Sequence, residues 1–286
     1  MQTRTIGGRQ VSAIGLGAMP LSIEGRPERT RAIATVHAAL NAGITLIDTA
    51  DAYSLGLDDF GHNEELIAEA LTSYGRDTSH VLVATKGGHT RTPDGGWELD
   101  GRPEYLKRAC EGSLKRLGVE AIDLYQFHRP DPKVPFGESV GALRDLLDEG
   151  KIRLAGVSNA NPAQIEQAAA VLGGRAASVQ NEFSPRFRSS EPELRLCDER
   201  GIAFLPWSPL GGISKAGGLG SVHAEFARIA ESRGVSPQRV CLAWMLAKSP
   251  VVVPIPGSSR PETVTDSAAA ADLVLTPEEV ARLDAA

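Results

Sequence analysis

The sequence predicts an α/β fold, a (β/α)8 barrel of the TIM type with a short N-terminal β-hairpin. Short runs of β-prone residues alternate with helical segments along nearly the whole chain. Successive runs begin roughly 25 to 50 residues apart, which is about one strand and one helix per repeat. Eight such repeats can close a barrel, and no linker-like stretch interrupts them. We therefore expect residues 1–286 to form a single domain.

Each element is assigned from its local pattern. The expected strands are 13–17, 44–49, 81–86, 122–128, 152–158, 177–182, 202–207 and 251–256. The expected helices are 27–42, 63–74, 103–117, 137–149, 162–172, 192–200 and 237–248. Proline near the start of several helices and glycine just past their ends is the usual asymmetry of helix boundaries. The hairpin is expected from runs 3–7 and 10–15, which flank Gly8-Arg9 and could cover the barrel floor.

A doubly wound dinucleotide-binding sheet is the competing architecture. Its glycine-rich phosphate turn would have to be the segment 15–18, which reads Gly-Leu-Gly-Ala. That segment lacks the G-x-G-x-x-G pattern, and the helix that follows it starts late. The barrel is therefore favoured.

Composition argues against several classes of partner. The chain has 30 Lys and Arg against 36 Asp and Glu, a net charge of −6, without the basic cluster that nucleic-acid binding needs. No apolar run reaches the roughly 18 residues that span a bilayer, and the start has no signal-peptide core, so we expect a cytoplasmic protein without a membrane partner. Cys110, Cys197 and Cys241 lack metal-site spacing, so we expect buried thiols and no metal.

Polar side chains gather where the expected strands end, which is where barrels of this kind carry their chemistry. Asp48, Lys86 and His128 lie at the ends of three successive strands, and Tyr53 follows Asp48 by five residues. An ammonium near the phenol would lower a pKa that is ordinarily about 10, and the carboxylate would keep the lysine charged. Such a phenol can protonate a carbonyl oxygen, with His128 orienting that oxygen or sharing the proton.

These residues belong to segments that resemble the aldo-keto reductase family along essentially the whole chain. The segments are GITLIDTADAYSLG, ATKGG, IDLYQFHRPDP, GKIRLAGVSN, VQNEFSP, PWSPLGG and PIPGSSRPETV. Asp48, Tyr53, Lys86 and His128 match the catalytic tetrad of that family one for one. The resemblance implies that NADPH delivers hydride to the carbonyl carbon of an aldehyde or ketone while Tyr53 protonates the oxygen.

The resemblance also implies a nicotinamide site. Ser158, Asn159 and Gln180 match the residues that hold the carboxamide, and Trp207 matches the aromatic residue that stacks on the ring. Ser208, Leu210 and Gly212 resemble the pyrophosphate loop. The other residues expected near the cofactor are Gly17, Ala18, Met19, Asp48, Pro209 and Ile255.

At the adenosine end, Gly257, Ser258, Ser259 and Arg260 resemble the site of the 2′-phosphate. A guanidinium can bind phosphate bidentately, so NADPH is expected in preference to NADH. The family usually has Glu-Asn for the adenine, where this chain has Asp266-Ser267. This departure is expected to alter cofactor affinity.

The substrate is expected to be a small carbonyl compound in contact with Tyr53, Trp97, His128 and Arg129. Trp97 and Arg129 come from the loops that follow the third and fourth strands, where barrel enzymes build their pockets. His89 lies in the first of these loops and is expected to be solvated. The protein is expected to be a monomer or a small homo-oligomer.

Two other functions remain open. Lys86 could be the Schiff-base nucleophile of a barrel aldolase, which would require desolvation and a depressed pKa. Alternatively, the chain could be a regulatory subunit that binds NADPH and responds to redox state without turnover. The residues themselves do not mark a docking face for such a role.

Overall fold

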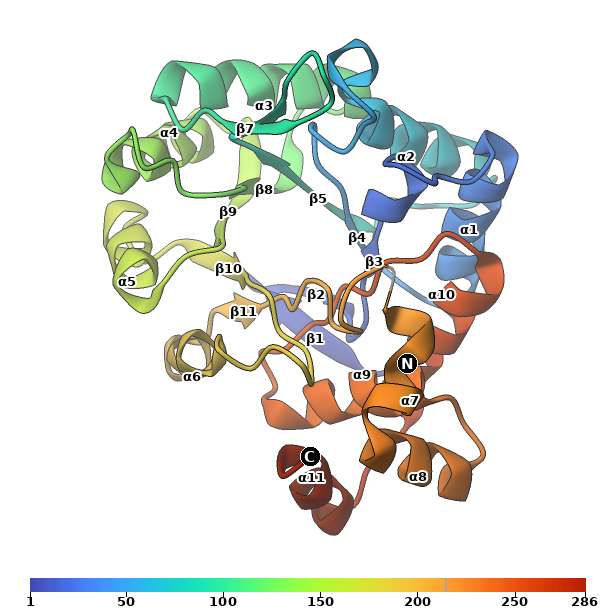
Figure 1. Ribbon diagram of the computed structural model, residues 1–286. Helices are drawn as coiled ribbons and strands as arrows, with labels where there is room; N and C mark the ends of the chain where they lie inside the picture. Colours follow the sequence, from blue (N-terminus) through green and yellow to red (C-terminus); the bar gives the residue numbers. More distant parts are fainter. Residues whose placement is uncertain (214) are drawn as a thin grey trace.

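The computed structural model describes residues 1–213 and 215–286. Its main sheet contains β3 (Leu16–Gly17), β4 (Leu46–Asp48), β5 (Leu82–Gly87), β8 (Ile122–Phe127), β9 (Ile152–Ser158), β10 (Ala176–Gln180) and β11 (Ala203–Phe204). The strands are parallel, and their order in the sheet is β11-β10-β9-β8-β5-β4-β3. They curl into a barrel with the helices on the outside (Figure 1). The predicted (β/α)8 barrel is confirmed.

The eighth strand position closes the barrel without forming a regular strand. Residues 251–256 lie between β11 and β3 and make hydrogen bonds to both. Val253 N donates to Phe204 O at 2.9 Å on one side, and Gly17 N donates to Pro256 O at 3.0 Å on the other. Proline occupies alternate positions at the end of this segment and has no N–H to donate, so only isolated bridges form.

The outer helices follow the expected segments to within two residues at each end. They are α1 (Arg29–Asn41), α2 (His62–Ser73), α3 (Pro103–Leu117), α4 (Phe136–Asp148), α5 (Pro162–Val171), α6 (Glu191–Arg200) and α9 (Pro237–Lys248). The structure adds elements that the sequence pattern did not single out: α7 (Leu219–Val222), α8 (Ala224–Arg233), α10 (Pro261–Ala268), α11 (Pro277–Asp284) and the hairpin strands β6 (His89–Arg91) and β7 (Trp97–Leu99). Apart from α8, each is eight residues or shorter, which leaves little periodicity to detect.

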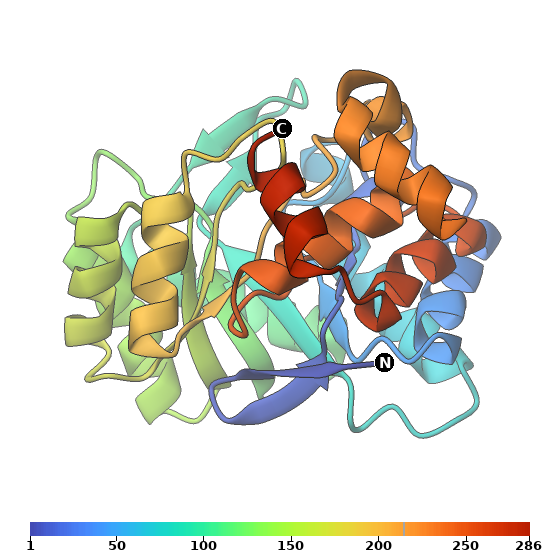
Figure 2. The same cartoon turned by 90° about the horizontal axis from the view of Figure 1, so that it is seen from below.

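The N-terminal hairpin seals one end of the barrel. Strands β1 (Thr3–Ile6) and β2 (Arg9–Ser12) pair antiparallel, as predicted. Ile6 and Val11 of this hairpin are buried among inward-facing residues that include Leu46, Leu82 and Leu124. Figure 2 shows β1 and β2 at the bottom edge of the barrel, with the β6–β7 hairpin at the top. Apolar packing therefore forms the floor, and the opposite end is left for polar side chains.

Alternation along the strands places polar groups above this floor. Side chains two apart on a strand share a face. Asp48 lies two residues beyond Leu46 on β4, and Lys86 lies four residues beyond Leu82 on β5, so both face the barrel interior. The sheet register pairs Lys86 with Gln126 on β8. The strands thus bring their polar ends to one level.

The predicted burial of the three cysteines is confirmed, since Cys110, Cys197 and Cys241 are buried and free. Among the residues described, no helix is long and apolar enough to span a membrane. The same residues include no group of three or more His, Cys, Asp or Glu side chains arranged to hold a metal ion.

Barrel closure leaves no space for a side chain at Gly17. A Cβ atom there would lie 2.6 Å from Ile255 O, a backbone atom of the closing segment. We expect Gly17→Ala to lower the free energy of unfolding by about 1–3 kcal/mol, measured by urea denaturation. Gly141 in α4 is the matched control, because a Cβ there meets nothing within 4 Å. Gly141→Ala should raise the free energy of unfolding by about 0.5–1 kcal/mol. Equal unfolding midpoints for the two variants would contradict the close contact between Gly17 and the closing segment.

Candidate active site

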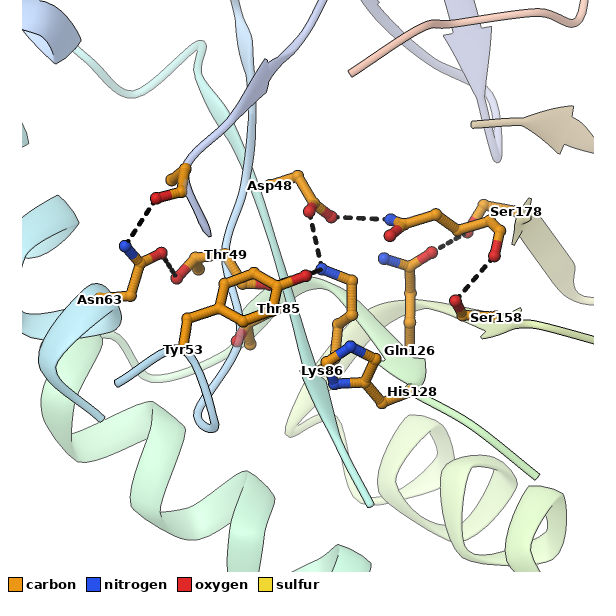
Figure 3. A network of polar contacts seen from close by, with 12 residues as sticks. Asp48, Thr49, Tyr53, Asn63, Thr85, Lys86, Gln126, His128, Ser158 and Ser178 are labelled. Atoms are coloured by element: carbon orange, nitrogen blue, oxygen red, sulfur yellow. Dashed lines mark hydrogen bonds and ion pairs between the residues drawn. The ribbon is translucent and has the colours of Figure 1, made fainter. Parts of the chain in front are cut away.

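Lys86 is fully buried at the centre of a polar cluster at the C-terminal ends of β4 and β5 (Figure 3). Its Nζ donates to Asp48 Oδ2 at 2.7 Å, to Thr49 O at 2.8 Å and to Tyr53 Oη at 3.0 Å. An ammonium has three N–H donors, and here each has an acceptor. The structure therefore brings three of the four expected catalytic residues into one hydrogen-bonded cluster.

Tyr53 reaches this cluster from a buried loop that follows β4. The loop is tied down by Asn63, in the first turn of α2, whose Oδ1 accepts from Thr49 Oγ1 at 2.6 Å. Asn63 Nδ2 donates to Ala18 O at 2.9 Å, which links the same side chain to the end of β3. Tyr53 is itself only 6% exposed. The phenol is thus presented by a constrained loop and not by a flexible one.

Burial decides the protonation state of the phenol. It raises the pKa of Tyr53, the Lys86 ammonium acts in the opposite direction, and Asp48 adds to the rise. The expected lowering by Lys86 is therefore present but is outweighed by the cost of burying a phenolate. Burial lowers the pKa of Lys86, but Asp48 and Tyr53 outweigh this effect and the pKa ends raised. At neutral pH the phenol is protonated and the lysine is charged.

His128 follows β8 and borders the same cluster. Its ring centroid lies 5.6 Å from that of Tyr53, and the two rings meet edge to face at 81°. Burial lowers the pKa of His128 well below its ordinary value, and Lys86, His89 and Arg129 add to the effect. The imidazole is therefore neutral at pH 7. Its Nδ1 is buried and has no hydrogen-bond partner among the residues described, so packing must hold the ring in place.

A cavity of about 600 Å³ opens above this cluster. The expected site residues that line it are Gly17, Met19, Asp48, Tyr53, Trp97, His128, Arg129, Ser158, Asn159, Gln180, Trp207, Ser208, Pro209, Leu210, Gly212, Ile255, Gly257, Ser258, Ser259, Arg260, Asp266 and Ser267. Ala18 and Lys86 are not part of the lining and are buried. Residues that the sequence pattern did not single out also line it: Pro20, His89, Ile213, Ala216, Gly217, Gln238, Glu262 and Thr263.

The amide side chains near the tetrad present acceptors that suit a carboxamide. Gln180 Nε2 donates to Asp48 Oδ1 at 2.8 Å. Asn159 Nδ2 donates to His128 O and to Ser158 Oγ, each at 3.0 Å. In the described part of the chain, no donor bonds the side-chain oxygen of Gln180 or Asn159, and both residues line the cavity. These two oxygens could accept from the NH2 group of a nicotinamide carboxamide.

The cavity wall holds strained backbone and an unpaired indole. Asn159 and Ser208 have φ of 55° and 48°, and they are the non-glycine residues with positive φ in the part of the chain that the structure covers. Such conformations cost about 1–3 kcal/mol and cluster at binding sites. Trp207 Nε1 is buried and, among the residues described, has no hydrogen-bond partner. These features mark this part of the wall as a candidate binding surface.

At the far end of the cavity, the lining residue Asp266 belongs to an internal ion pair. Arg239 Nη2 donates to Asp266 Oδ1 at 2.6 Å, and Ser236 Oγ donates to the other oxygen of that carboxylate. Asp266 therefore already accepts hydrogen bonds from within the protein while it lines the cavity. Arg260, at the start of α10, is exposed and forms no ion pair with any residue described. Its guanidinium is open to an anionic group.

His89 differs from the expectation of a solvated side chain. It is partly buried, stacks on Trp97 with ring centroids 4.5 Å apart, and lines the cavity. Burial lowers its pKa to about 4, with Arg129 and Arg91 adding to the effect. The signal in the sequence is the short alternating pair HTR and WEL, which forms β6 and β7. The polar residues around these two short segments made the strand pattern hard to recognise in the sequence.

Comparisons with known proteins agree with this geometry. The family model described as "Aldo/keto reductase family" matches residues 13–286. An uncharacterized oxidoreductase of Schizosaccharomyces pombe is 35% identical over 289 residues, which cover 99% of this chain and 89% of that protein.

Solved structures with a similar fold include two bacterial proteins. The glycerol dehydrogenase of Gluconobacter oxydans is 30% identical with a TM-score of 0.84, and the match covers 99% of this chain and 94% of that one. The aldo-keto reductase of Klebsiella pneumoniae in complex with NADPH is 30% identical with a TM-score of 0.81, and the match covers 100% and 95% of the two chains. With the barrel and its buried Lys86 cluster, these matches show that the chain belongs to the aldo/keto reductase family of oxidoreductases.

Proposed function

We propose that the protein reduces aldehydes or ketones to alcohols with hydride from NADPH, and that Tyr53 is the general acid. The observation that carries this proposal is the buried hydrogen bond from Lys86 Nζ to Tyr53 Oη at 3.0 Å, at the edge of a cavity. Membership of the family supports an oxidoreductase that acts on carbonyl groups. The NADPH complex of the Klebsiella pneumoniae relative supports the choice of cofactor.

The residues present could hold a nicotinamide cofactor along the cavity. Asn159 and Gln180 would accept from the carboxamide, and Trp207 would lie against the ring. Arg260 would pair with the 2′-phosphate at the other end. When bound, NADPH supplies the hydride that reduces the carbonyl carbon. Because the lining runs from Gly17 to Ser267, we also propose that residues 1–286 act as one domain with a small-molecule substrate.

The tetrad would supply the proton and stabilise the charge left behind. Tyr53 would give its phenolic proton to the carbonyl oxygen as negative charge develops there. The ammonium of Lys86, which already donates to Tyr53 Oη, would stabilise the resulting phenolate without any rearrangement. Asp48 keeps Lys86 charged and in place. His128, neutral and at the cavity edge, would donate a hydrogen bond to the same carbonyl oxygen.

The alternative role of Lys86 as a Schiff-base nucleophile is disfavoured. An aldolase lysine must lose its proton, which needs a depressed pKa. Here the pKa of Lys86 is raised, since Asp48 and Tyr53 outweigh the lowering effect of burial. All three of its N–H donors are also engaged. The regulatory-subunit alternative predicts tight NADPH binding without turnover on any carbonyl.

Removal of the phenolic hydroxyl should abolish the proposed reaction. We expect Tyr53→Phe to lower kcat for aldehyde reduction by about 100-fold or more, the usual contribution of a general acid, with NADPH binding nearly unchanged. The measurements are loss of NADPH absorbance with an aromatic aldehyde and quenching of protein fluorescence by NADPH. Tyr74→Phe is the control, because that hydroxyl bonds Asn41 on the surface. Full turnover by Tyr53→Phe would remove Tyr53 from the acid role.

The raised pKa of Tyr53 fixes the sign of the pH dependence. Below that pKa the phenol is protonated and ready to act as an acid, so kcat for reduction should be flat from about pH 6 to 9 and should fall at more alkaline pH. Alcohol oxidation needs the phenolate as a base, so its rate should rise over the same alkaline range. The two directions are compared with matched substrates in one buffer series. A reduction rate that climbs with pH would be inconsistent with this assignment.

We expect Arg260 to determine the preference for NADPH over NADH. We expect Arg260→Ala to weaken NADPH binding by about 1.5–3 kcal/mol, since a charged hydrogen bond to phosphate is lost. NADH has no 2′-phosphate and serves as the internal control, so its dissociation constant should change little. Both constants are measured by fluorescence titration. Equal losses for the two cofactors would contradict the 2′-phosphate role.

A further inference from the structure

The β6–β7 hairpin follows directly after the strand that carries Lys86. Its register pairs His89 with Leu99 and Arg91 with Trp97. Side chains of directly paired residues lie on the same face of a hairpin, as do those two positions apart on one strand. His89, Arg91 and Trp97 therefore share one face.

Arg91 ties this hairpin to the loop that carries the phenol. Its side chain is only 1% exposed. Nε donates to Ser54 O at 3.1 Å, and Nη2 donates to the same oxygen. Nη1 donates to Gly95 O at 2.9 Å, within the turn of the hairpin. Because Ser54 directly follows Tyr53, a buried guanidinium holds the backbone next to the proposed acid.

From Arg91 a continuous series of ring contacts leads back to the tetrad. The guanidinium carbon lies 3.7 Å from the ring centroid of Trp97. Trp97 stacks on His89, with centroids 4.5 Å apart and planes at 29°. His89 meets His128 at 5.0 Å and 86°, and His128 meets Tyr53 at 5.6 Å and 81°. Together these contacts form a closed circuit, which runs from the loop of Tyr53 through the hairpin and back to Tyr53.

This circuit of contacts includes those that can orient the imidazole of His128. A functional histidine is often oriented by a hydrogen bond to its second nitrogen. In His128 the Nδ1 atom is buried without a partner among the residues described, so that restraint is missing there. The edge contacts with His89 on one side and Tyr53 on the other remain, and edge-to-face packing is a directional interaction. The orientation of the imidazole thus depends on a residue of the hairpin.

We propose that the β6–β7 hairpin positions Tyr53 and His128 relative to one another, with His89 and Arg91 as positioning residues. Arg91 fixes the backbone beside the phenol, and His89 fixes the ring of His128. This inference rests on the proposed carbonyl reduction. The simpler alternative is that the hairpin is only a wall of the substrate pocket. The two differ in kinetics, because a wall changes KM whereas misplaced acid and imidazole groups lower kcat.

Arg91 gives the cleaner test because it does not line the cavity. We expect Arg91→Met to lower kcat by about 10- to 100-fold, the scale of an ångström-level misplacement, with KM and NADPH affinity within about twofold of wild type. Arg91→Lys, which can still donate to Ser54 O, should recover part of that loss. Glu98→Gln is the matched control, since Glu98 is exposed and alternates in β7 with Trp97. A rise in KM at unchanged kcat would overturn the proposal.

His89 tests the second contact independently, in case Arg91→Met does not fold. His89→Phe keeps a flat ring and should retain kcat to within about threefold, whereas His89→Ala should lower kcat by about tenfold. Equal kcat values for wild type and His89→Ala, with a change in KM alone, would leave His89 as pocket wall and overturn its positioning role.

A measurement without turnover separates this proposal from the function on which it rests. Ring ¹³C NMR resolves the six histidines, and the His128→Asn variant assigns the signal of His128. Tyr53, Lys86, Arg129 and His89 face this imidazole. In His89→Ala, water gains access to the imidazole, so the pKa of His128 should rise toward its ordinary value. In His89→Phe the aromatic ring still excludes water, so that pKa should stay low. Identical titrations in all three proteins would overturn the proposal, whereas the expected shifts in a protein that reduces no carbonyl would uphold the positioning and refute the proposed function.

Discussion

The structure depends on the placement of one buried ammonium. A lysine removed from water is costly unless every N–H finds an acceptor and a counter-charge is close. Lys86 meets both conditions only because β4 supplies Asp48, the next residue supplies Thr49 O, and the loop beyond supplies Tyr53. If any of these elements moved, at least one N–H of the buried ammonium would lose its acceptor. The strand register, the loop after β4 and the first turn of α2 are therefore all coupled to a single side chain.

Burial shifts the pKa values of Tyr53 and His128 in opposite directions. It raises the pKa of Tyr53 and lowers that of His128, because in each case the charged form is disfavoured. Both rings are thus neutral at pH 7 beside a charged lysine. A neutral phenol holds a proton to give, and a neutral imidazole can accept or donate a hydrogen bond without repelling the ammonium. These protonation states are the ones that the proposed reduction requires.

Much of the barrel follows from patterns that are local in sequence. The β-prone runs 44–49 and 81–86 identified the two strands, and the position of Asp48 and Lys86 where these runs end placed both side chains at the catalytic end of the barrel. The closing segment 251–256 was assigned a strand because its residues are apolar, but prolines remove the donors that a ladder needs, so its role depends on the strands on either side. His89 was missed for a different reason. Its burial is produced by cross-strand contact with Trp97 and by the neighbouring His128, and neither contact can be read from single positions in a polar loop.

The predicted cofactor residues show where a motif stops being informative. The exchange of the usual Glu-Asn pair for Asp266-Ser267 is visible in the sequence, but its consequence is not. Only the three-dimensional arrangement shows that Asp266 is bound by Arg239 and Ser236, residues roughly thirty positions away. Because these partners come from another part of the chain, the sequence around Asp266 does not predict them.

The seam between β3 and the proline-containing closing segment 251–256 has a consequence for the lifetime of the protein. Between Gly17 and the segment that ends at Pro256, the barrel is joined by an isolated bridge and not by a regular strand ladder. The cavity lining continues across this seam, with Gly17 on one side and Gly257 on the other. A molecule bound along the cavity would contact both sides and add its binding energy to the closure. Ligand concentration in the cell would then set how often the barrel opens and how readily a protease can cut it, so metabolic state and protein abundance would be linked.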